Sequence, residues 1–234
     1  MKLPPPEKVP AGPVDWTQAC RLVPARYRPE ECFERIADTL EIGERLVQLA
    51  DLTGVGADDF ASMDPGKILF GAGAGWINAA FITPRPGRFS THRQGAFYAT
   101  REIETSVAEV KFHLEQDYRK EGILESMDLE YRALGVHLRG TLHDLRGCNR
   151  VRAPWAAIHD PDAYTVSQSF AASLRAAGSA GILWLSLRRE GGACAAVFDP
   201  NTLRACRHDT YLTFRWNGRD IHQVFERRIL ALKA

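Results

Sequence analysis

Residues 95–120 read GAFYATREIETSVAEVKFHLEQDYRK and place a short strand directly before a long helix. Gly95–Ala99 is a short apolar run of the kind that forms strands. From about Glu102 to Lys120 the apolar residues recur at helical spacing, and Thr100 is expected to cap the N-terminus. The apolar stripe of this helix consists of Ile103, Val107, Val110, Leu114 and Tyr118.

The rest of the chain adds further helices and strands in an irregular order. Helical spacing predicts two helices within 29–52, separated near Gly43, and one helix at 167–177. Strands are expected at 76–82, 133–138, 181–186 and 192–198, the last two joined as a hairpin by the turn at 188–191. Residues 54–75 are predicted as loops, and segments 210–216 and 219–228 complete the pattern. This order favours the α+β class over a regular βαβ series.

Composition narrows the class of protein. The 234 residues include 30 Lys plus Arg and 29 Asp plus Glu, so the net charge of +1 gives no footprint for direct nucleic-acid binding. No apolar run approaches the roughly 20 residues that a membrane-spanning helix needs. Five prolines precede Trp16, which predicts a flexible tail over 1–15 and a single catalytic domain over 16–234. Five scattered cysteines without a C-x-x-C pair indicate reduced thiols in a cytoplasm.

Two familiar patterns are incomplete. The run Gly71–Trp76 lacks the third glycine of a dinucleotide-binding fingerprint, because residue 76 is Trp, and a strand is expected to follow it. The pairs His143-Asp144 and His159-Asp160 lack the further ligands that a metal site requires. We therefore expect a loop at the glycines and no catalytic metal.

Glu109 is the most informative single residue. It lies in the middle of the predicted helix on a face with few charges, so its carboxylate should be partly buried, which costs free energy unless the group is paired or functional. A salt bridge to an arginine is the plain alternative. Ser186 ends an apolar strand, where a serine usually bonds the neighbouring backbone. Arg88 follows a glycine in a polar loop, where it is either an anion ligand or a solvated residue.

Four stretches then occur in a specific order. They are RLVPARY (21–27), GRFS with GAFYA (87–90 and 95–99), TSVAEV (105–110) and GILWLSLR (181–188), with Glu109 eleven residues after Tyr98. Taken together, these stretches resemble the RES domain, a family named for an Arg, a Glu and a Ser. The resemblance implies a fold like that of ADP-ribosyltransferase toxins, with two small β-sheets and surrounding helices around an NAD cleft.

The resemblance also implies an activity. Members are typically cytoplasmic toxins that destroy NAD by transferring ADP-ribose to water or phosphate, and each pairs with a small helix-turn-helix antitoxin of Xre type, alone or in an oligomer. NAD is the substrate, phosphate an alternative co-substrate, and no prosthetic group is implied. The resemblance assigns catalysis to Glu109, Arg88, Ser186 and Tyr98, and NAD binding to Arg21, Tyr27, Arg88, Tyr98 and Gln168.

Five of the assigned residues suit a physical requirement of breaking the nicotinamide–ribose bond. Glu109 would stabilise positive charge on the ribose, and Arg88 and Arg21 would hold the diphosphate. Tyr98 would supply an aromatic wall and a hydroxyl, and Ser186 would orient Glu109 or the ribose. Two alternatives stay open at this point: transfer of ADP-ribose to a specific protein, and an inactive nucleotide-binding module.

Overall fold

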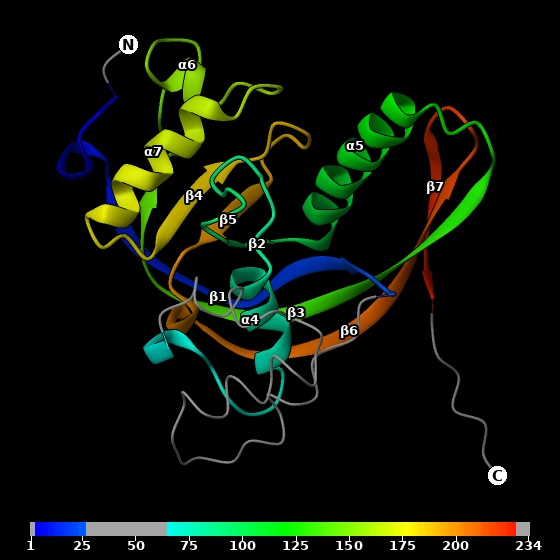
Figure 1. Cartoon of the computed structure of the whole chain (residues 1–234), viewed down its shortest axis with the longest axis horizontal. Helices are drawn as coiled ribbons and strands as arrows, with labels where there is room; N and C mark the ends of the chain where they lie inside the picture. Colours follow the sequence, from blue (N-terminus) through cyan, green and yellow to red (C-terminus); the bar gives the residue numbers. More distant parts are fainter. Residues whose placement is uncertain (1–2, 27–64, 228–234) are drawn as a thin grey trace.

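The computed structural model describes residues 3–26 and 65–227, in which seven strands form one sheet (Figure 1). The sheet order is β1-β2-β5-β4-β3-β6-β7. The strands are β1 (Ala11–Pro24), β2 (Phe97–Thr100), β3 (Met127–Asp144), β4 (Gly181–Leu185), β5 (Ala193–Val197), β6 (Leu203–Trp216) and β7 (Ile221–Arg227). The α-helices of the described residues are α4 (Ala74–Ile82), α5 (Ile103–Glu121), α6 (Trp155–Ile158) and α7 (Thr165–Ala176), accompanied by short 3-10 helices at Pro6–Lys8, Pro65–Lys67 and Pro200–Thr202.

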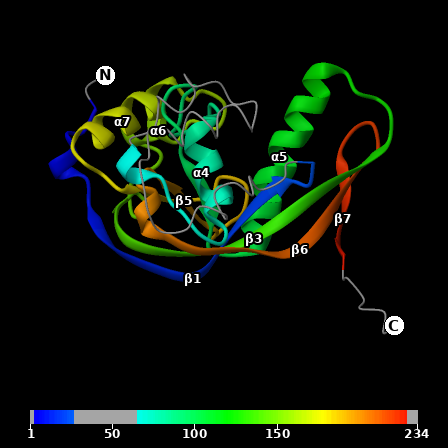
Figure 2. The same cartoon turned by 60° about the horizontal axis from the view of Figure 1, so that its bottom comes forward.

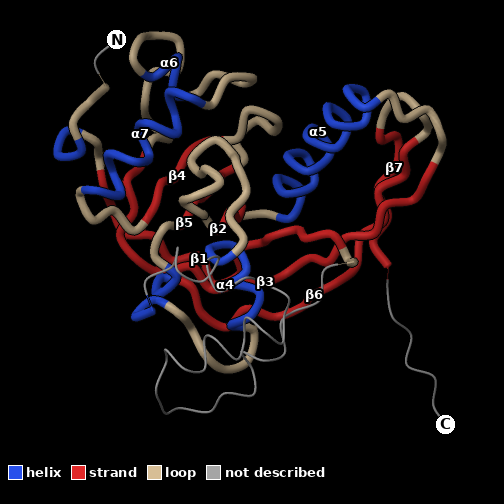
Figure 3. The backbone as a smooth tube through the Cα atoms, in the orientation of Figure 1, coloured by secondary structure: helices blue, strands red, loops and turns tan. Residues whose placement is uncertain are grey.

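Strand β3 decides the architecture. It spans 18 residues and pairs with β1 on one edge and with β6 and β4 on the other. Because β1 also pairs with β2 at Cys20 and Thr100, the strands β1, β2, β5, β4 and β3 close into a ring. Beyond the ring, β3 continues with β6 and β7 as a twisted ribbon (Figure 3). The expectation of two small sheets is therefore wrong for the described residues, since the long β3 belongs to both regions and keeps them in one sheet.

Helices α6 and α7 cover one face of the β2–β5–β4 part of the ring (Figure 1). Alternate strand residues such as Ile182, Trp184 and Ala196 point to this face, where they pack with Phe170 and Leu174 of α7. The residues between them, such as Leu183 and Ala195, face the other way, into a larger cluster with α4. Figure 2 shows α4 next to the long strand β6. The two faces of these central strands are thus both buried.

Helix α5 packs on the ribbon, apart from α6 and α7. All five residues of the predicted apolar stripe contact the cluster around Leu212, Phe214 and Trp216 of β6, which confirms the amphipathic helix. The predicted cap is wrong, because the N-cap residue is Glu102. Thr100 Oγ1 instead donates to the Glu102 carbonyl and shares a hydrogen bond with Ser106. The opposite, polar side of α5 contributes to the candidate functional site.

The segment expected as a strand at 76–82 is part of helix α4. It is apolar around most of its circumference and buried on most sides, so a short apolar run does not distinguish strand from helix. Its buried Asn78 is satisfied by Leu69, whose carbonyl accepts from Nδ2 at 2.8 Å and whose N–H donates to Oδ1 at 3.1 Å. Gly73 begins the helix with φ 78°, and a Cβ there would lie 1.9 Å from the Cys206 carbonyl oxygen. The glycine run therefore permits close packing on β6.

The predicted flexible tail is also partly wrong. Residues 11–15 belong to β1 and pair with 139–143 of β3, and Val9 is buried. Here β1 pairs only with β3, so proline, which lacks an N–H group, is tolerated along an otherwise unpaired edge.

Most later predictions are confirmed, including helix α7 and the antiparallel hairpin of β4 and β5. The strand expected at 133–138 is the centre of the much longer β3. The helices expected within 29–52 and the loop up to residue 64 lie outside the described residues. In the part of the chain that is described, no helix is long and apolar enough to cross a membrane.

Candidate functional site

Glu109 lies on α5, half-buried, on the side turned toward the β4–β5 hairpin. Its Oε1 atom accepts a hydrogen bond from Ser186 Oγ at 2.6 Å, and the Cys194 thiol lies 3.8 Å from the same oxygen. No ion pair of the described residues includes Glu109, so the salt bridge weighed as its plain alternative is not found there. The hydrogen-bond donors that the described residues supply to this carboxylate, a hydroxyl and a thiol, are both neutral.

Ser186 follows directly after β4 and is buried. Its hydroxyl accepts from the backbone N–H groups of Arg188 at 2.9 Å and Arg189 at 3.0 Å. A hydroxyl has two acceptor positions and one proton, so these two bonds leave the proton for Glu109. Ser186 therefore both orders the hairpin turn, as a strand serine commonly does, and orients the carboxylate.

Cys194 is a site residue that the sequence did not indicate. It lies on β5, is 2% exposed and directs its sulfur to Glu109. Burial and the nearby negative charge of Glu109 raise the pKa of the Cys194 thiol, so the sulfur keeps its proton and acts as a donor. Its only sequence signal is a position within a buried strand, which is shared with many structural cysteines.

Arg88 is at the tip of a tight turn in which Gly87 and Ser90 pair through their backbones. Its side chain is only 8% exposed, and its Nη1 donates to the carbonyl oxygens of Asp160 at 2.6 Å and Ile158 at 3.3 Å. Its guanidinium also lies 4.8 Å from the centre of the Tyr164 ring.

Arg88 is a buried cation to which the described residues supply no carboxylate at ion-pair distance. Burial lowers the pKa of Arg88, and the nearby Tyr164 and Glu109 partly offset this effect. No ion pair of the described ranges joins Arg88 to a carboxylate. A buried cation without a counter-ion is costly, and an anionic ligand would remove that cost.

Two polar side chains hold the Arg88 turn. The Tyr98 hydroxyl accepts from the Phe89 N–H at 2.8 Å and lies 3.0 Å from Ser90 Oγ. Gln168 of α7 donates through Nε2 to the carbonyl oxygens of Gly87 and Ser90, both at 3.0 Å. Residue 87 must be small, since a Cβ there would lie 2.8 Å from the Tyr98 hydroxyl oxygen.

The Tyr98 ring packs edge-to-face on Trp184, with 6.2 Å between ring centres. Burial raises the pKa of Tyr98, so its hydroxyl stays protonated at neutral pH. The hydrogen bonds of the Tyr98 and Gln168 side chains thus hold the backbone turn that carries Arg88.

Arg21 contacts the backbone of Tyr98 and the ring of Phe97. Its Nη1 donates to the Tyr98 carbonyl at 3.1 Å, and its guanidinium lies 4.5 Å from the centre of the Phe97 ring. Phe97 and Tyr98 are consecutive strand residues with side chains on opposite faces, so Arg21 is on the Phe97 side of β2. Burial lowers the pKa of Arg21 to about 10. Tyr27, the other NAD-binding residue predicted from this stretch, lies outside the described residues.

Three further residues surround Glu109 and Arg88. His113 is one turn after Glu109 on α5, Arg188 follows Ser186 in the hairpin turn, and Tyr164 lies on the Arg88 guanidinium. The charges of Glu109, Arg88 and Arg188 all act on His113. The sequence offers one usable signal for His113, its spacing of four residues from Glu109 on a helix.

The His-Asp pairs serve structural contacts. His143 Nδ1 lies 2.8 Å from Ser179 Oγ, and Asp144 forms an ion pair with Arg146. The backbone carbonyl of Asp160 accepts from Arg88, as described above. Across residues 3–26 and 65–227, no group of three or more His, Cys, Asp or Glu side chains is arranged to hold a metal ion.

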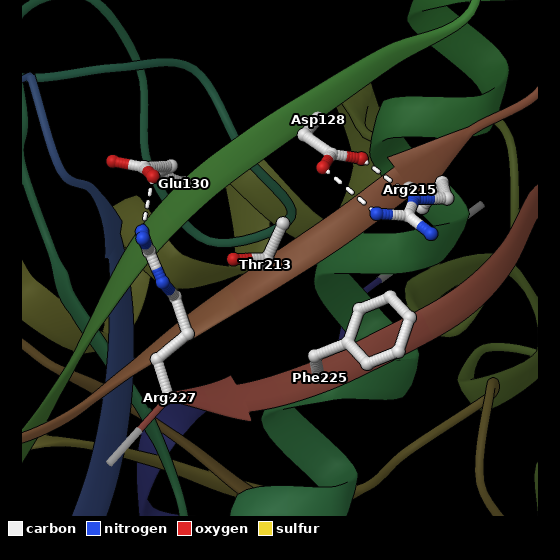
Figure 4. A pocket seen from close by; sticks show the side chains of 6 residues that line it. All are labelled: Asp128, Glu130, Thr213, Arg215, Phe225 and Arg227. Atoms are coloured by element: carbon white, nitrogen blue, oxygen red, sulfur yellow. Dashed lines mark hydrogen bonds and ion pairs between the residues drawn. The ribbon is translucent and has the colours of Figure 1, made fainter. Parts of the chain in front are cut away.

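A separate hollow of about 350 Å³ lies on the β3–β6–β7 ribbon (Figure 4). It contains none of the predicted site residues, and its charges are matched in the pairs Asp128–Arg215 and Glu130–Arg227. Thr213 and Phe225 complete its lining. With no uncompensated charge, this hollow is a poorer candidate than the region around Glu109 and Arg88.

Comparisons with known proteins place the chain in a family. A comparison with curated proteins gives no match. A solved structure, that of the M. tuberculosis MbcT–MbcA toxin–antitoxin complex, contains a chain that is 15% identical, with a TM-score of 0.47, over 85% of this chain and 87% of that one. The family model of the RES domain matches residues 68–217, which include Arg88, Tyr98, Glu109, Gln168 and Ser186. The chain therefore belongs to the RES domain family.

Proposed function

We propose that this protein is a toxin-like enzyme that cleaves the nicotinamide–ribose bond of NAD and transfers ADP-ribose to water or phosphate. The observation that carries the proposal is the state of Glu109: a half-buried carboxylate, oriented by Ser186 and unpaired with any cation at contact distance in the described residues. Nearby Arg88 is a buried cation to which the described residues supply no carboxylate partner. Together they match the positively charged nicotinamide–ribose end of NAD and its negatively charged diphosphate.

The chemistry requires stabilisation of positive charge. When the bond between the ribose and nicotinamide breaks, its electron pair goes to the ring nitrogen, and neutral nicotinamide leaves. Positive charge then develops on the anomeric carbon, where a carboxylate stabilises it as in glycoside hydrolysis. Water or phosphate forms the new carbon–oxygen bond, and water releases a proton. Ser186 and Cys194 both bind Oε1, which leaves Oε2 for the ribose.

Arg88 would hold the diphosphate through charge-assisted hydrogen bonds. Tyr98 and Gln168 fix the turn that carries it, so we assign them as positioning residues for Arg88. Ser186 has the corresponding role for Glu109.

We also propose a small helix-turn-helix antitoxin of Xre type as the partner, action in the cytoplasm, and a relationship of the strand ring to the ADP-ribosyltransferase fold. Membership in the RES family, whose typical members are such toxins, supports these three points. Co-expression with the product of an adjacent gene tests the partner: the antitoxin should co-purify and suppress NAD loss.

The activity test is incubation of purified protein with NAD, with and without phosphate. Nicotinamide should appear in step with NAD loss, and a phosphate-dependent rate would identify phosphate as the acceptor. Labelled NAD in the presence of cell proteins separates the alternatives. Label on one protein with little free ADP-ribose would favour protein modification, and NAD binding without turnover would favour an inactive module.

NAD cleavage is expected to proceed without an added metal ion. The reason is that the described part of the site offers a carboxylate and cations but no cluster of metal ligands. Nicotinamide release is measured before and after treatment with a chelator. An activity that disappears with the chelator and returns with zinc or magnesium would contradict this prediction.

Tyr98→Phe is expected to lower the free energy of unfolding by about 1–3 kcal/mol, because the buried Phe89 N–H loses its acceptor. The looser turn should also raise the KM for NAD more than it lowers kcat. Urea unfolding and steady-state kinetics measure the two effects. Tyr211→Phe is the control, because its ring stacks on His208, away from the Arg88 turn. Equal behaviour of the two variants would refute the positioning role.

A further inference from the structure

The β4–β5 hairpin turn, which contains Arg188, lies between α5 and the α6–α7 layer (Figure 1). The Arg188 backbone N–H donates to Ser186 Oγ at 2.9 Å, the same hydroxyl that orients Glu109. The start of its side chain is therefore fixed relative to the carboxylate.

The Arg188 side chain spans the two sides of the site. Its guanidinium carbon lies 3.2 Å from the centre of the Phe112 ring on α5. Its Nη2 donates to the Pro161 carbonyl, in the connection between α6 and α7, at 3.0 Å. A ring face and one backbone carbonyl leave most of the five N–H donors of an arginine for a ligand.

A second arginine lies near Arg88, since the positive charge of Arg188 acts on both Arg88 and His113. No ion pair of the described residues gives either arginine a carboxylate partner. Two neighbouring arginines without such partners favour an anionic ligand.

The next residue provides a contrast. Arg189 comes from the same turn, but it lies 3.7 Å from the Glu102 carboxylate and donates to Thr105 Oγ1 at 3.0 Å. Its charge is compensated outside the site, although it is a similarly accessible arginine one position away. The difference between the two arginines is the presence of a counter-ion.

We propose that Arg188 is a second anion-binding residue of this site and that, with Arg88, it holds the diphosphate of a dinucleotide. It takes the role that the sequence suggested for Arg21, which lies on the Phe97 side of β2. On binding, the guanidinium would give up the Pro161 carbonyl for phosphate oxygens and close over the ligand between α5 and α7. The assignment rests on the proposed NAD substrate, but it concerns binding and not bond cleavage.

Calorimetric titration tests the assignment with two probes, ADP-ribose, which carries the diphosphate, and adenosine, which does not. Arg188→Ala should weaken ADP-ribose binding about tenfold or more and leave adenosine binding unchanged, and Arg188→Lys should recover part of the loss. Arg189→Ala should bind both probes as the wild type does. Thermal melting checks that the variants are folded, and Arg188→Gln or Arg189→Gln replaces the corresponding alanine variant if that variant is unfolded.

Unchanged ADP-ribose binding in Arg188→Ala, or an equal loss in Arg189→Ala, overturns the assignment. So does a wild type that does not bind ADP-ribose. Binding that depends on Arg188 in a protein that releases no nicotinamide supports the assignment and contradicts only the proposed reaction. Nicotinamide release with a KM for NAD that Arg188→Ala leaves unchanged overturns the assignment and leaves the reaction standing.

Discussion

Glu109→Gln is expected to stay folded and to release nicotinamide from NAD about 10²–10³-fold more slowly than the wild type, as when one oriented electrostatic group is lost. The substitution preserves size and an acceptor for Ser186, and it removes the negative charge. NAD affinity should change much less, because the charge matters most when the glycosidic bond is stretched. Turnover, NAD binding and melting temperature are compared side by side.

Glu115→Gln on the same helix is the matched control. Glu115 accepts from the Ile221 N–H at 2.8 Å and forms ion pairs with Lys111 and Arg119, so its role is to join α5 to β7. This variant should lose stability and keep its turnover. Stability of Glu109→Gln should hold or rise, since a partly buried charge not needed for folding is removed. If Glu109→Gln instead lost stability and kept its turnover, while Glu115→Gln lost turnover, Glu109 would be a structural residue.

Arg88→Ala is expected to raise the KM for NAD about 10- to 100-fold with a smaller change in kcat. The expected loss is about 1.5–3 kcal/mol, the contribution of hydrogen bonds to a charged group. These contacts are made before and during bond cleavage, so their removal weakens ground state and transition state alike. Steady-state kinetics measure the effect at a temperature where the variant is folded.

Arg88→Lys separates charge from geometry. Lysine keeps the charge but not the planar, two-pronged donor, so partial recovery of KM is expected. The stability of both variants should fall somewhat, because the Ile158 and Asp160 carbonyl oxygens lose their donor. A strong fall in kcat with unchanged KM would instead assign Arg88 to the transition state.

The elements that the sequence predicted well carry a clear local signal. Helix α5 has a stripe of five apolar residues on one face, and β4 and β5 are apolar runs joined by a turn. Helix α4 was predicted as a strand because it is buried on most sides and so has no polar face. Its hydrogen-bonded Asn78 does not distinguish a helix from a strand. The start of β1 was obscured by prolines, which the unpaired part of its edge accepts.

The sequence indicated several residues of the site, but not how the fold arranges them in space. The prediction was that Ser186 orients Glu109 or the ribose, and its contact with Glu109 spans 77 residues, which only the fold can establish. The sequence did not indicate the Cys194 thiol, because burial in a strand is no signal of function. Arg21 was grouped with Arg88 as a phosphate ligand; its described contacts are with the Phe97 ring and the Tyr98 carbonyl, and its role in binding stays a prediction. The contacts of Tyr98 and Gln168 with the Arg88 turn depend on packing that no local pattern encodes.

Nicotinamide release from NAD by purified wild-type protein and by Glu109→Gln, measured under identical conditions, decides whether Glu109 acts in NAD cleavage. We expect steady release by the wild type and a folded variant with about 10²–10³-fold lower turnover. A folded Glu109→Gln that releases nicotinamide at a rate near that of the wild type would contradict this expectation.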